Sequence, residues 1–308
     1  MRTPLISVIV PTYRRSAYLA DTLDSVFSQT LREFEVIVVE DGSRDAGETL
    51  ARYGDRVQYL WQPNQGVGAA RNFGVSRARG EWFAFIDDDD LWLPEKLERQ
   101  LAAAEREPEM GMFHTDHYAL VDGERKVPVR TPPRDRVPTG WVAKDLFLNN
   151  FIVMSSVMIR RAPFTRVGGF SATTRFAADL ELWLRLARIC PIAFVAEPLT
   201  IYRDHDRSLS SELRWHVAFA GMMSRFVHSN PEIYREVGRK AVRRQLRDIN
   251  WRGAYAHLQQ HHYATAARLF ASAWSWTPRD LRPLFYAAAC LTGRRGVGLL
   301  RGAKQVVG

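Results

Sequence analysis

The sequence predicts an α/β fold built on a mostly parallel sheet, and two observations indicate it. First, four short runs rich in Val and Ile punctuate the first ninety residues, at 5–10, 34–39, 57–61 and 82–86. Most are nearly continuously apolar, as strands buried on both faces are. Second, helical patterns lie between strands, and one of them covers about 67–78. Such strand–helix alternation indicates parallel strands covered by helices.

Each further element has a local signal of its own. Leu19, Leu23 and Val26 recur at the spacing of an amphipathic helix after the first strand. After the fourth strand, Pro94 suits the first turn of a helix that Leu97 continues. Later in the chain we expect a helix over 179–188 and strands over 113–121, 153–159 and 194–202.

Charge is distributed unevenly along the 308 residues. Residues 1–204 hold 26 Lys and Arg against 28 Asp and Glu, whereas residues 205–308 hold 17 against 6. The pattern also becomes helical from about residue 209, so we expect a domain over 1–208 and a basic helical region over 209–308. A basic surface favours anionic partners such as phospholipid headgroups or nucleic acid. The alternative is a solvated helical face that has no partner.

The sequence favours a cytoplasmic protein. Its first apolar run is short and continues into a strand pattern, unlike a signal peptide. The apolar run at 284–291 is far shorter than the roughly 20 residues that span a bilayer. Cys190 and Cys290 have neither a disulfide-framework nor a metal-ligand spacing, so we expect reduced thiols.

Three polar motifs follow strands of the predicted sheet. They are Pro-Thr-Tyr at 11–13, Glu-Asp-Gly-Ser at 40–43 and four consecutive aspartates at 87–90. Ligands of such sheets gather at the carboxyl ends of the strands. The sequence therefore predicts a site at this edge.

The four aspartates predict a divalent metal. One of them is expected to be structural, and a helix N-cap or a solvated acidic turn is the alternative for the group. Adjacent like charges repel, so a cation is expected to relieve them. Oxygen ligands without nearby His or Cys pairs favour Mg²⁺ or Mn²⁺, which complete their coordination with phosphates and water. The missing partner is therefore expected to be a metal-bound diphosphate.

A second glycine-rich stretch is misleading. GVGAAR at 66–71 begins like the dinucleotide fingerprint but has Arg71 where the third glycine belongs. Neither a dinucleotide site nor a P-loop is expected. Arg71 itself can hold a phosphate or a base near the sheet edge.

Taken in order, SVIVPTYRRSAYLADTLDSVFSQT, FEVIVVEDGSRD and NQGVGAARNFGVSRARGEWFAFIDDDDLWLPEKL resemble the family 2 glycosyltransferases of the GT-A fold. The ordered match covers about residues 6–208, and its order and spacing make it specific. The resemblance implies a nucleotide-sugar-binding half over 1–110 and an acceptor half over 111–208. It implies nucleotide contacts from Pro11, Thr12, Tyr13, Glu40, Asp41 and Arg71.

The resemblance also assigns the aspartates. The D-x-D motif of the family falls on Asp87 and Asp89, or on the adjacent pair Asp88 and Asp89. Both registers share Asp89, which is the expected metal ligand, with Asp87 as its companion. Asp88 is then a contact to the ribose.

The family carries a base before an L-W-x-R-like helix, and AADLELWLRLA resembles that segment. Measured back from Arg185, Asp179 takes the base position, with Glu181 as the alternative. Relatives have two acids where this chain has Ala178-Asp179, so one carboxylate is missing. A structural N-cap is the other interpretation of Asp179.

The remaining assignments are weaker in sequence. In YRDHDRSLS, Arg203 and Arg207 are expected to meet the departing diphosphate, and His205 to add a metal ligand or to be a surface residue. Trp183, Ser155 and Gly169 are expected to shape the acceptor side.

These features predict an inverting, metal-dependent transfer of a sugar, most simply from a UDP-sugar, to a glycan or lipid-linked acceptor. The basic region is expected to contact an anionic membrane at its inner face, and no nucleic-acid partner is expected. One alternative is a sugar-1-phosphate nucleotidylyltransferase, although PTYRRS is not its glycine-rich loop. Another is a non-catalytic scaffold with a basic tail that binds glycan or another anion.

Overall fold

The computed structural model describes residues 3–121, 124–126, 136–172, 174, 176–203, 213–293 and 296. The chain divides into two compact units, residues 1–205 and 206–308. Each unit is described by itself.

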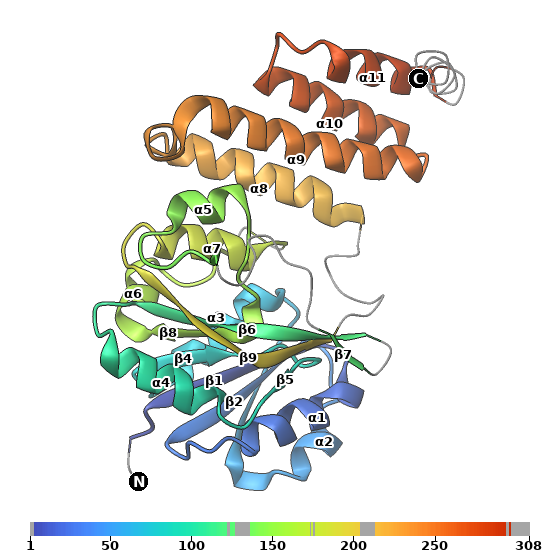
Figure 1. Ribbon diagram of the computed structural model, residues 1–308. Helices are drawn as coiled ribbons and strands as arrows, with labels where there is room; N and C mark the ends of the chain where they lie inside the picture. The colour runs from blue at the N-terminus through green and yellow to red at the C-terminus, as the bar shows by residue number, and fades with distance from the viewer. Residues whose placement is uncertain are drawn as a thin grey trace. The chain divides into compact units, whose positions relative to one another are not determined.

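The first unit is an α/β domain around one sheet (Figure 1). Its strands are β1 (Ile6–Thr12), β2 (Phe34–Asp41), β3 (Val57–Gln62), β4 (Trp82–Phe85), β5 (Leu91–Trp92), β6 (Met112–Val121), β7 (Glu124–Lys126), β8 (Val157–Arg160) and β9 (Ile192–Arg203). Its helices are α1 (Ser16–Phe27), α2 (Gly47–Ala51), α3 (Val67–Arg77), α4 (Lys96–Arg106), α5 (Ala143–Leu148), α6 (Arg161–Arg166) and α7 (Ala178–Leu186). Short 3₁₀ turns occupy η1 (Gly54–Arg56) and η3 (Met154–Ser156).

The strand order is β3-β2-β1-β4-β8-β6-β9-β5, with β7 paired to β6. The first four strands are all parallel, as the alternating pattern predicts. The later strands add antiparallel pairs of β8 with β4 and β6, whereas β6 and β9 are parallel. Because β1 lies between β2 and β4 in parallel register, the residues that follow these three strands meet at one edge.

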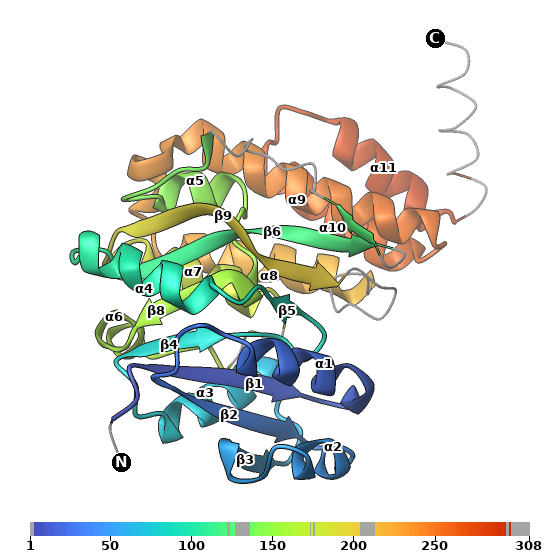
Figure 2. The ribbon, with the colours of Figure 1, turned by 60° about the horizontal axis from the view of Figure 1, so that its bottom comes forward.

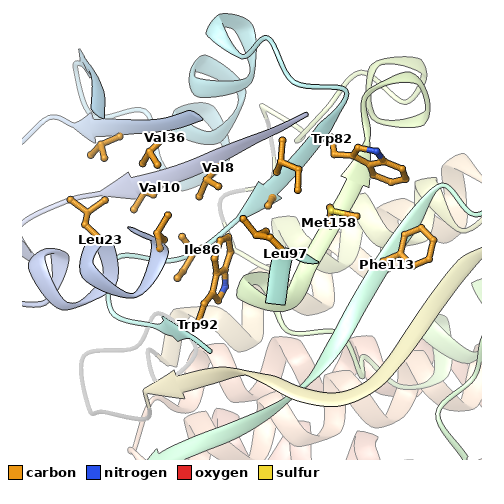
Figure 3. Packing of buried hydrophobic residues seen from close by; sticks show 14 of the residues in the cluster. Val8, Val10, Leu23, Val36, Trp82, Ile86, Trp92, Leu97, Phe113 and Met158 are labelled. Carbon is orange, nitrogen blue, oxygen red and sulfur yellow. The ribbon is translucent and has the colours of Figure 1, made fainter. Parts of the chain in front are cut away.

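Both faces of the parallel strands are covered, which explains their continuous hydrophobicity. Val8 and Val10 of β1 pack with Leu23 of α1 and Leu97 of α4 on one face (Figure 3). Helix α3 covers the other face, where a Cβ on Gly74 would lie 2.7 Å from the Ile9 side chain. Figure 2 shows α1 and α3 on opposite sides of β1 and β2.

Two predicted elements differ from the structure. The strand expected over 153–159 begins only at Val157, because residues 154–156 form η3, whose hydroxyls bond to polar groups nearby. The helix expected to begin near Pro94 begins at Lys96. Strand β5, which sequence reasoning did not predict, pairs with β9 just before it.

The second unit is helical, as predicted. It contains α8 (Leu213–Ser229), a π-helical turn η5 (Tyr234–Gly238), α9 (Arg239–Gln259), α10 (Tyr263–Trp276) and α11 (Arg282–Leu291). Successive helices pack on one another from α8 to α11. None of the described helices has both the length and the hydropathy needed to cross a lipid bilayer.

Candidate active site

The turn after β1 presents one aromatic ring at the sheet edge. Pro11 and Thr12 are buried, whereas Tyr13 is 40% exposed. The next residue, Arg14, has a positive φ of 55°, and its N–H donates to Ser43 Oγ at 3.2 Å. The left-handed backbone at Arg14 is uncommon for a residue with a side chain. The turn therefore holds Tyr13 outward next to the loop that follows β2.

The end of β2 is saturated with hydrogen bonds. Glu40 has no exposed surface, and its Oε1 accepts from Ser43 Oγ at 2.9 Å and from the N–H groups of Asp45 and Ala46. Its Oε2 accepts from the Tyr59 hydroxyl at 2.6 Å. These contacts give Glu40 a structural role in shaping the loop, and its contact with a nucleotide stays a prediction.

Asp41 organises the next loop in the same way. Its Oδ1 accepts from Gln62 Nε2 at 2.8 Å and from the Gln65 N–H at 2.9 Å, and its Oδ2 accepts from the Gly66 N–H at 2.8 Å. The carboxylate thus fixes the entry to α3, which begins at Val67. This places α3 and its Arg71 against the site.

The acidic turn after β4 is clamped from two sides. The Thr22 hydroxyl of α1 donates to the carbonyls of Asp88 and Asp90 at 3.0 and 2.8 Å. Asp90 is 1% exposed and accepts from Ser155 Oγ at 2.5 Å and from the Arg203 N–H at 2.9 Å. Burial, with the neighbouring aspartates, raises the pKa of Asp90 well above its ordinary value. Asp90 is therefore the structural aspartate that the sequence leads us to expect.

An arginine that sequence reasoning missed meets the next two carboxylates. Arg15, which immediately precedes α1, forms an ion pair with Asp89 and lies 3.6 Å from Asp88 Oδ1. Although burial lowers it, the charges of Asp89, Asp88 and Asp87 raise the pKa of Arg15. Its position two residues after Tyr13 of the Pro-Thr-Tyr motif was the available signal.

A second arginine meets the first aspartate. Arg71 Nη2 lies 2.5 Å from Asp87 Oδ1, and the guanidinium stands over the Phe170 ring at 5.3 Å. Arg71 is 5% exposed, and its Nε has no hydrogen-bond partner among the described residues. The sequence placed Arg71 near a phosphate or base, and the structure places it beside the acidic turn.

Asp88 is a buried carboxylate, one oxygen of which is unpaired among the described residues. It is 4% exposed, and its Oδ2 is buried without a hydrogen-bond partner in the described part of the chain. Burial and the charge of Asp89 raise its pKa to about 7, although Thr12 and Arg15 oppose the shift. An orphaned buried oxygen of this kind is a ready ligand or hydrogen-bond acceptor.

Asp179 reaches the same edge from α7. Burial raises its pKa, whereas the backbone N–H of Leu180 and then the charge of Arg71 lower it, and the charge of Asp87 raises it again. Asp179, Arg71 and Asp87 therefore share one electrostatic environment. Ala177, just before α7, has a positive φ of 55°. A left-handed backbone is strained for alanine, and strained residues of this kind cluster at functional sites.

Glu181, the alternative base, is fully engaged elsewhere. Its carboxylate forms a two-point ion pair with Arg185, at 2.8 and 2.6 Å. Arg185 also donates to the carbonyls of Val167 and Gly169. The pair holds the loop before α7, which favours Asp179 as the base.

The three residues expected on the acceptor side make their contacts inside the domain. Trp183 is 0% exposed, so its contribution, which stays a prediction, is through packing. Ser155 lies against the acidic turn, where its Oγ accepts from the Asp87 N–H at 3.0 Å. Gly169 has a φ of 69°, and a Cβ there would lie 2.6 Å from Asn72 Oδ1 of α3. Only glycine allows that approach.

Arg203 is held by the acidic turn. It would lose these contacts if it moved toward a ligand. Its Nε donates to the Asp89 carbonyl at 2.9 Å, and its guanidinium stands over the Tyr18 ring at 4.8 Å. Its contact with a diphosphate stays a prediction. His205 and Arg207 lie outside the described residues.

The donor set fits a hard divalent cation. Asp88 and Asp89 supply carboxylate oxygens, and one of these oxygens, Asp88 Oδ2, is buried without a hydrogen-bond partner in the described part of the chain. The described residues contain no group of three or more His, Cys, Asp or Glu arranged to hold a metal. Mg²⁺ commonly uses one or two protein carboxylates with phosphate oxygens, so a fuller cage is unnecessary.

Comparison with known proteins identifies the class. The family model described as glycosyl transferase family 2 matches residues 7–168. An uncharacterized glycosyltransferase of Rickettsia typhi is 31% identical over 207 residues, which are 66% of this chain and 65% of that protein. This chain thus spans slightly less than two thirds of that relative.

Solved structures show the fold. TarS residues 1–349 of S. aureus, in complex with UDP, superpose with a TM-score of 0.63 at 18% identity, covering 92% of this chain and 87% of that 1–349 fragment. The mannosyltransferase PcManGT of Pyrobaculum calidifontis, in complex with GDP-Man and Mn²⁺, gives 0.59 at 19% identity, with 97% and 81% covered. The architecture is the GT-A fold. The chain belongs to glycosyl transferase family 2.

Proposed function

We propose that this chain transfers a sugar from a nucleotide-sugar donor to a hydroxyl of a glycan or lipid-linked acceptor, with inversion at the anomeric carbon. One observation carries the proposal. Asp179 lies within the electrostatic reach of Arg71 and Asp87, although about ninety residues separate it from the acidic turn. A candidate base and a candidate diphosphate site therefore share one sheet edge.

The donor site is built from the strand ends. Tyr13 offers an exposed ring next to the Asp41 loop, which suits a nucleotide base, and Asp88 would contact the ribose. UDP is the first nucleotide to test, since TarS was solved with UDP. GDP is the second, because PcManGT was solved with GDP-Man.

The metal would be held by Asp89 together with Asp87 or Asp88. When bound, Mn²⁺ or Mg²⁺ supplies positive charge against the leaving diphosphate. Arg71 adds fixed positive charge at the same place, and such preorganised charge lowers the barrier as the leaving group departs. His205 stays a predicted further ligand and Arg207 a predicted diphosphate contact.

Asp179 would accept the proton of the attacking hydroxyl. A buried carboxyl whose pKa is raised is a stronger base than an exposed one, yet Arg71 keeps its charged form accessible. Glu181 lacks this freedom because Arg185 holds both its oxygens.

The acceptor would lie at an anionic membrane on the inner face, contacted through the second unit. Arg239, Lys240, Arg243 and Arg244 are exposed on one face of the first turns of α9. Cations near a helix N-terminus oppose the helix dipole, so helix stability does not explain them. Each contributes about 1 kcal/mol near an anionic bilayer.

Vesicle sedimentation tests this surface. Lys240→Glu with Arg243→Glu should abolish binding to phosphatidylglycerol vesicles, with phosphatidylcholine vesicles as the background. The control is Arg252→Glu with Arg268→Glu, the same charge change at exposed positions elsewhere in the unit. Equal loss in both variants would mean that general positive charge, and not this surface, binds lipid.

Calorimetry tests the donor site. UDP, GDP and dTDP are titrated into the wild type and into Asp89→Ala, each with and without Mn²⁺. Binding of one nucleotide that requires Mn²⁺ and is lost in Asp89→Ala is expected. Binding of none would overturn the proposal and favour a scaffold. Release of pyrophosphate from a nucleoside triphosphate and a sugar 1-phosphate would instead indicate a nucleotidylyltransferase.

A further inference from the structure

Arg15 occupies a position that helix formation does not favour. It stands at the N-cap of α1 without a side-chain capping hydrogen bond, and α1, whose residues are all described, has no acidic residue in its first turn. Helix N-termini favour Ser, Thr, Asp or Asn and disfavour cations. The compensating interaction is the ion pair with Asp89 and the nearby Asp88.

The charges at the acidic turn balance incompletely. Arg71 pairs with Asp87, and Arg15 is shared between Asp88 and Asp89. With Arg203, whose Nε donates to the Asp89 carbonyl, three guanidinium groups meet the four aspartates of the turn, so one carboxylate lacks a counter-charge among the described residues. This lack of positive charge coincides with Asp88 Oδ2, which is buried without a hydrogen-bond partner in the described part of the chain. A divalent cation on these oxygens would stand within a few ångströms of the Arg15 guanidinium, and two such like charges repel strongly at that range.

We propose that Arg15 is an exchangeable counter-cation: it neutralises Asp88 and Asp89 in the ligand-free protein, leaves them when a divalent cation binds, and then contacts the diphosphate of the donor. The inference rests on the proposed function, whose metal and nucleotide it uses. Arg15 is partly exposed, with 24% of its side chain accessible, so its guanidinium borders the solvent from which a ligand would arrive.

Two consequences follow for binding. In the free protein Arg15 competes with the metal, so the metal alone binds weakly. Once the nucleotide is present, the released guanidinium gains a new partner, so each ligand strengthens the other. This coupling is reciprocal, as linkage requires.

Mn²⁺ affinity without nucleotide tests the competition. Free Mn²⁺ is followed by electron paramagnetic resonance during titration of the wild type, Arg15→Gln and Arg14→Gln. Arg15→Gln should bind Mn²⁺ about tenfold more tightly, since a competing charge at short range is removed. Arg14→Gln removes the same charge one residue away, from a guanidinium that stands over Tyr13, and should change the affinity less than twofold.

UDP affinity with and without Mn²⁺ tests the proposed contact between the released Arg15 and the diphosphate. The gain that Mn²⁺ gives to UDP binding should fall about tenfold in Arg15→Gln and stay unchanged in Arg14→Gln. If Arg15→Gln does not fold, Arg15→Lys replaces it, and its more compact, more strongly hydrated ammonium should give an intermediate Mn²⁺ affinity.

The outcomes separate the two proposals. Equal Mn²⁺ affinity in the wild type and the Arg15 variants overturns the exchange but leaves the transferase standing. Absence of Mn²⁺ binding in every variant, with or without UDP, overturns both. Tighter Mn²⁺ binding together with an undiminished gain for UDP overturns the contact with the diphosphate.

Discussion

The carboxylates after β2 and those after β4 lie on one edge of the same sheet but meet different partners. Glu40 and Asp41 accept hydrogen bonds from backbone N–H groups and neutral side chains of the loops they shape. Three of the aspartates after β4 instead face guanidinium groups, and one of their oxygens has no partner in the described chain.

This difference distinguishes carboxylates that stabilise the fold from carboxylates that are available to a ligand. A carboxylate whose oxygens are filled by protein donors stabilises the fold and has little to offer a ligand. A carboxylate held by charge alone can exchange one cation for another. A related contrast recurs on α7. Arg185 pairs with both oxygens of Glu181, whereas Asp179 accepts from backbone N–H groups and feels Arg71 through its charge.

The largest expected effect breaks the contrast on α7. Asp179→Asn should lower kcat about a thousandfold, because a general base typically contributes 10²- to 10⁴-fold. Glu181→Gln should keep most of kcat and lose about 1 kcal/mol of stability with its ion pair. Nucleoside diphosphate release is the measurement, and the reverse pattern would assign the base to Glu181.

The next effect compares the two strand ends directly. Asp41→Ala leaves the N–H groups of Gln65 and Gly66 without their acceptor, so the free energy of unfolding should fall by about 3 kcal/mol. Asp89→Ala relieves repulsion as it loses Arg15, so its change should stay within about 1 kcal/mol. Urea denaturation measures both, and similar losses would contradict the distinction.

Lys96 shows what burial does to an ionisable group that has no carboxylate partner among the described residues. Lys96 has no exposed surface, and its contacts are with Gln100 and the Trp92 ring, so burial places its pKa well below the ordinary value. The unfolded chain then binds a proton that the folded chain does not, up to about pH 10.4. Unfolding free energy should therefore rise with pH by up to about 1.4 kcal/mol per unit in this window.

Lys96→Met isolates this contribution, because it keeps the packing of the stem and removes the titrating group. Urea denaturation at several pH values between 7.5 and 9.5 should give a flatter slope in the variant. Parallel slopes would show that Lys96 is charged in the folded protein.

The smallest effect concerns the strained residue before Asp179. Ala177→Gly should stabilise the protein by about 0.5 kcal/mol, because glycine adopts a φ of 55° without the clash of a Cβ. Ala178→Gly, one residue later and inside α7, should cost about 1 kcal/mol. Thermal unfolding distinguishes them, and a loss in both would show that Ala177 is not strained.

Most of the fold follows from local pattern. Short apolar runs separated by helical patterns predict parallel strands, and β1, β2, β3 and β4 agree. Strand β5 escaped prediction because its two residues are defined only by their pairing with β9. The 3₁₀ turn η3 escaped because Ser155 is drawn to Asp90, a residue 65 positions away.

The sequence by itself determined the α/β class and predicted a site at the carboxyl edge of the parallel strands, because periodicity and strand ends are local properties. Tertiary structure alone decided which carboxylates accept hydrogen bonds from neutral groups and which meet guanidinium groups. Arg15, Arg71 and Arg203 come from three distant segments to meet one acidic turn. Side-chain pairing across the fold depends on where segments pack, and no local pattern encodes it.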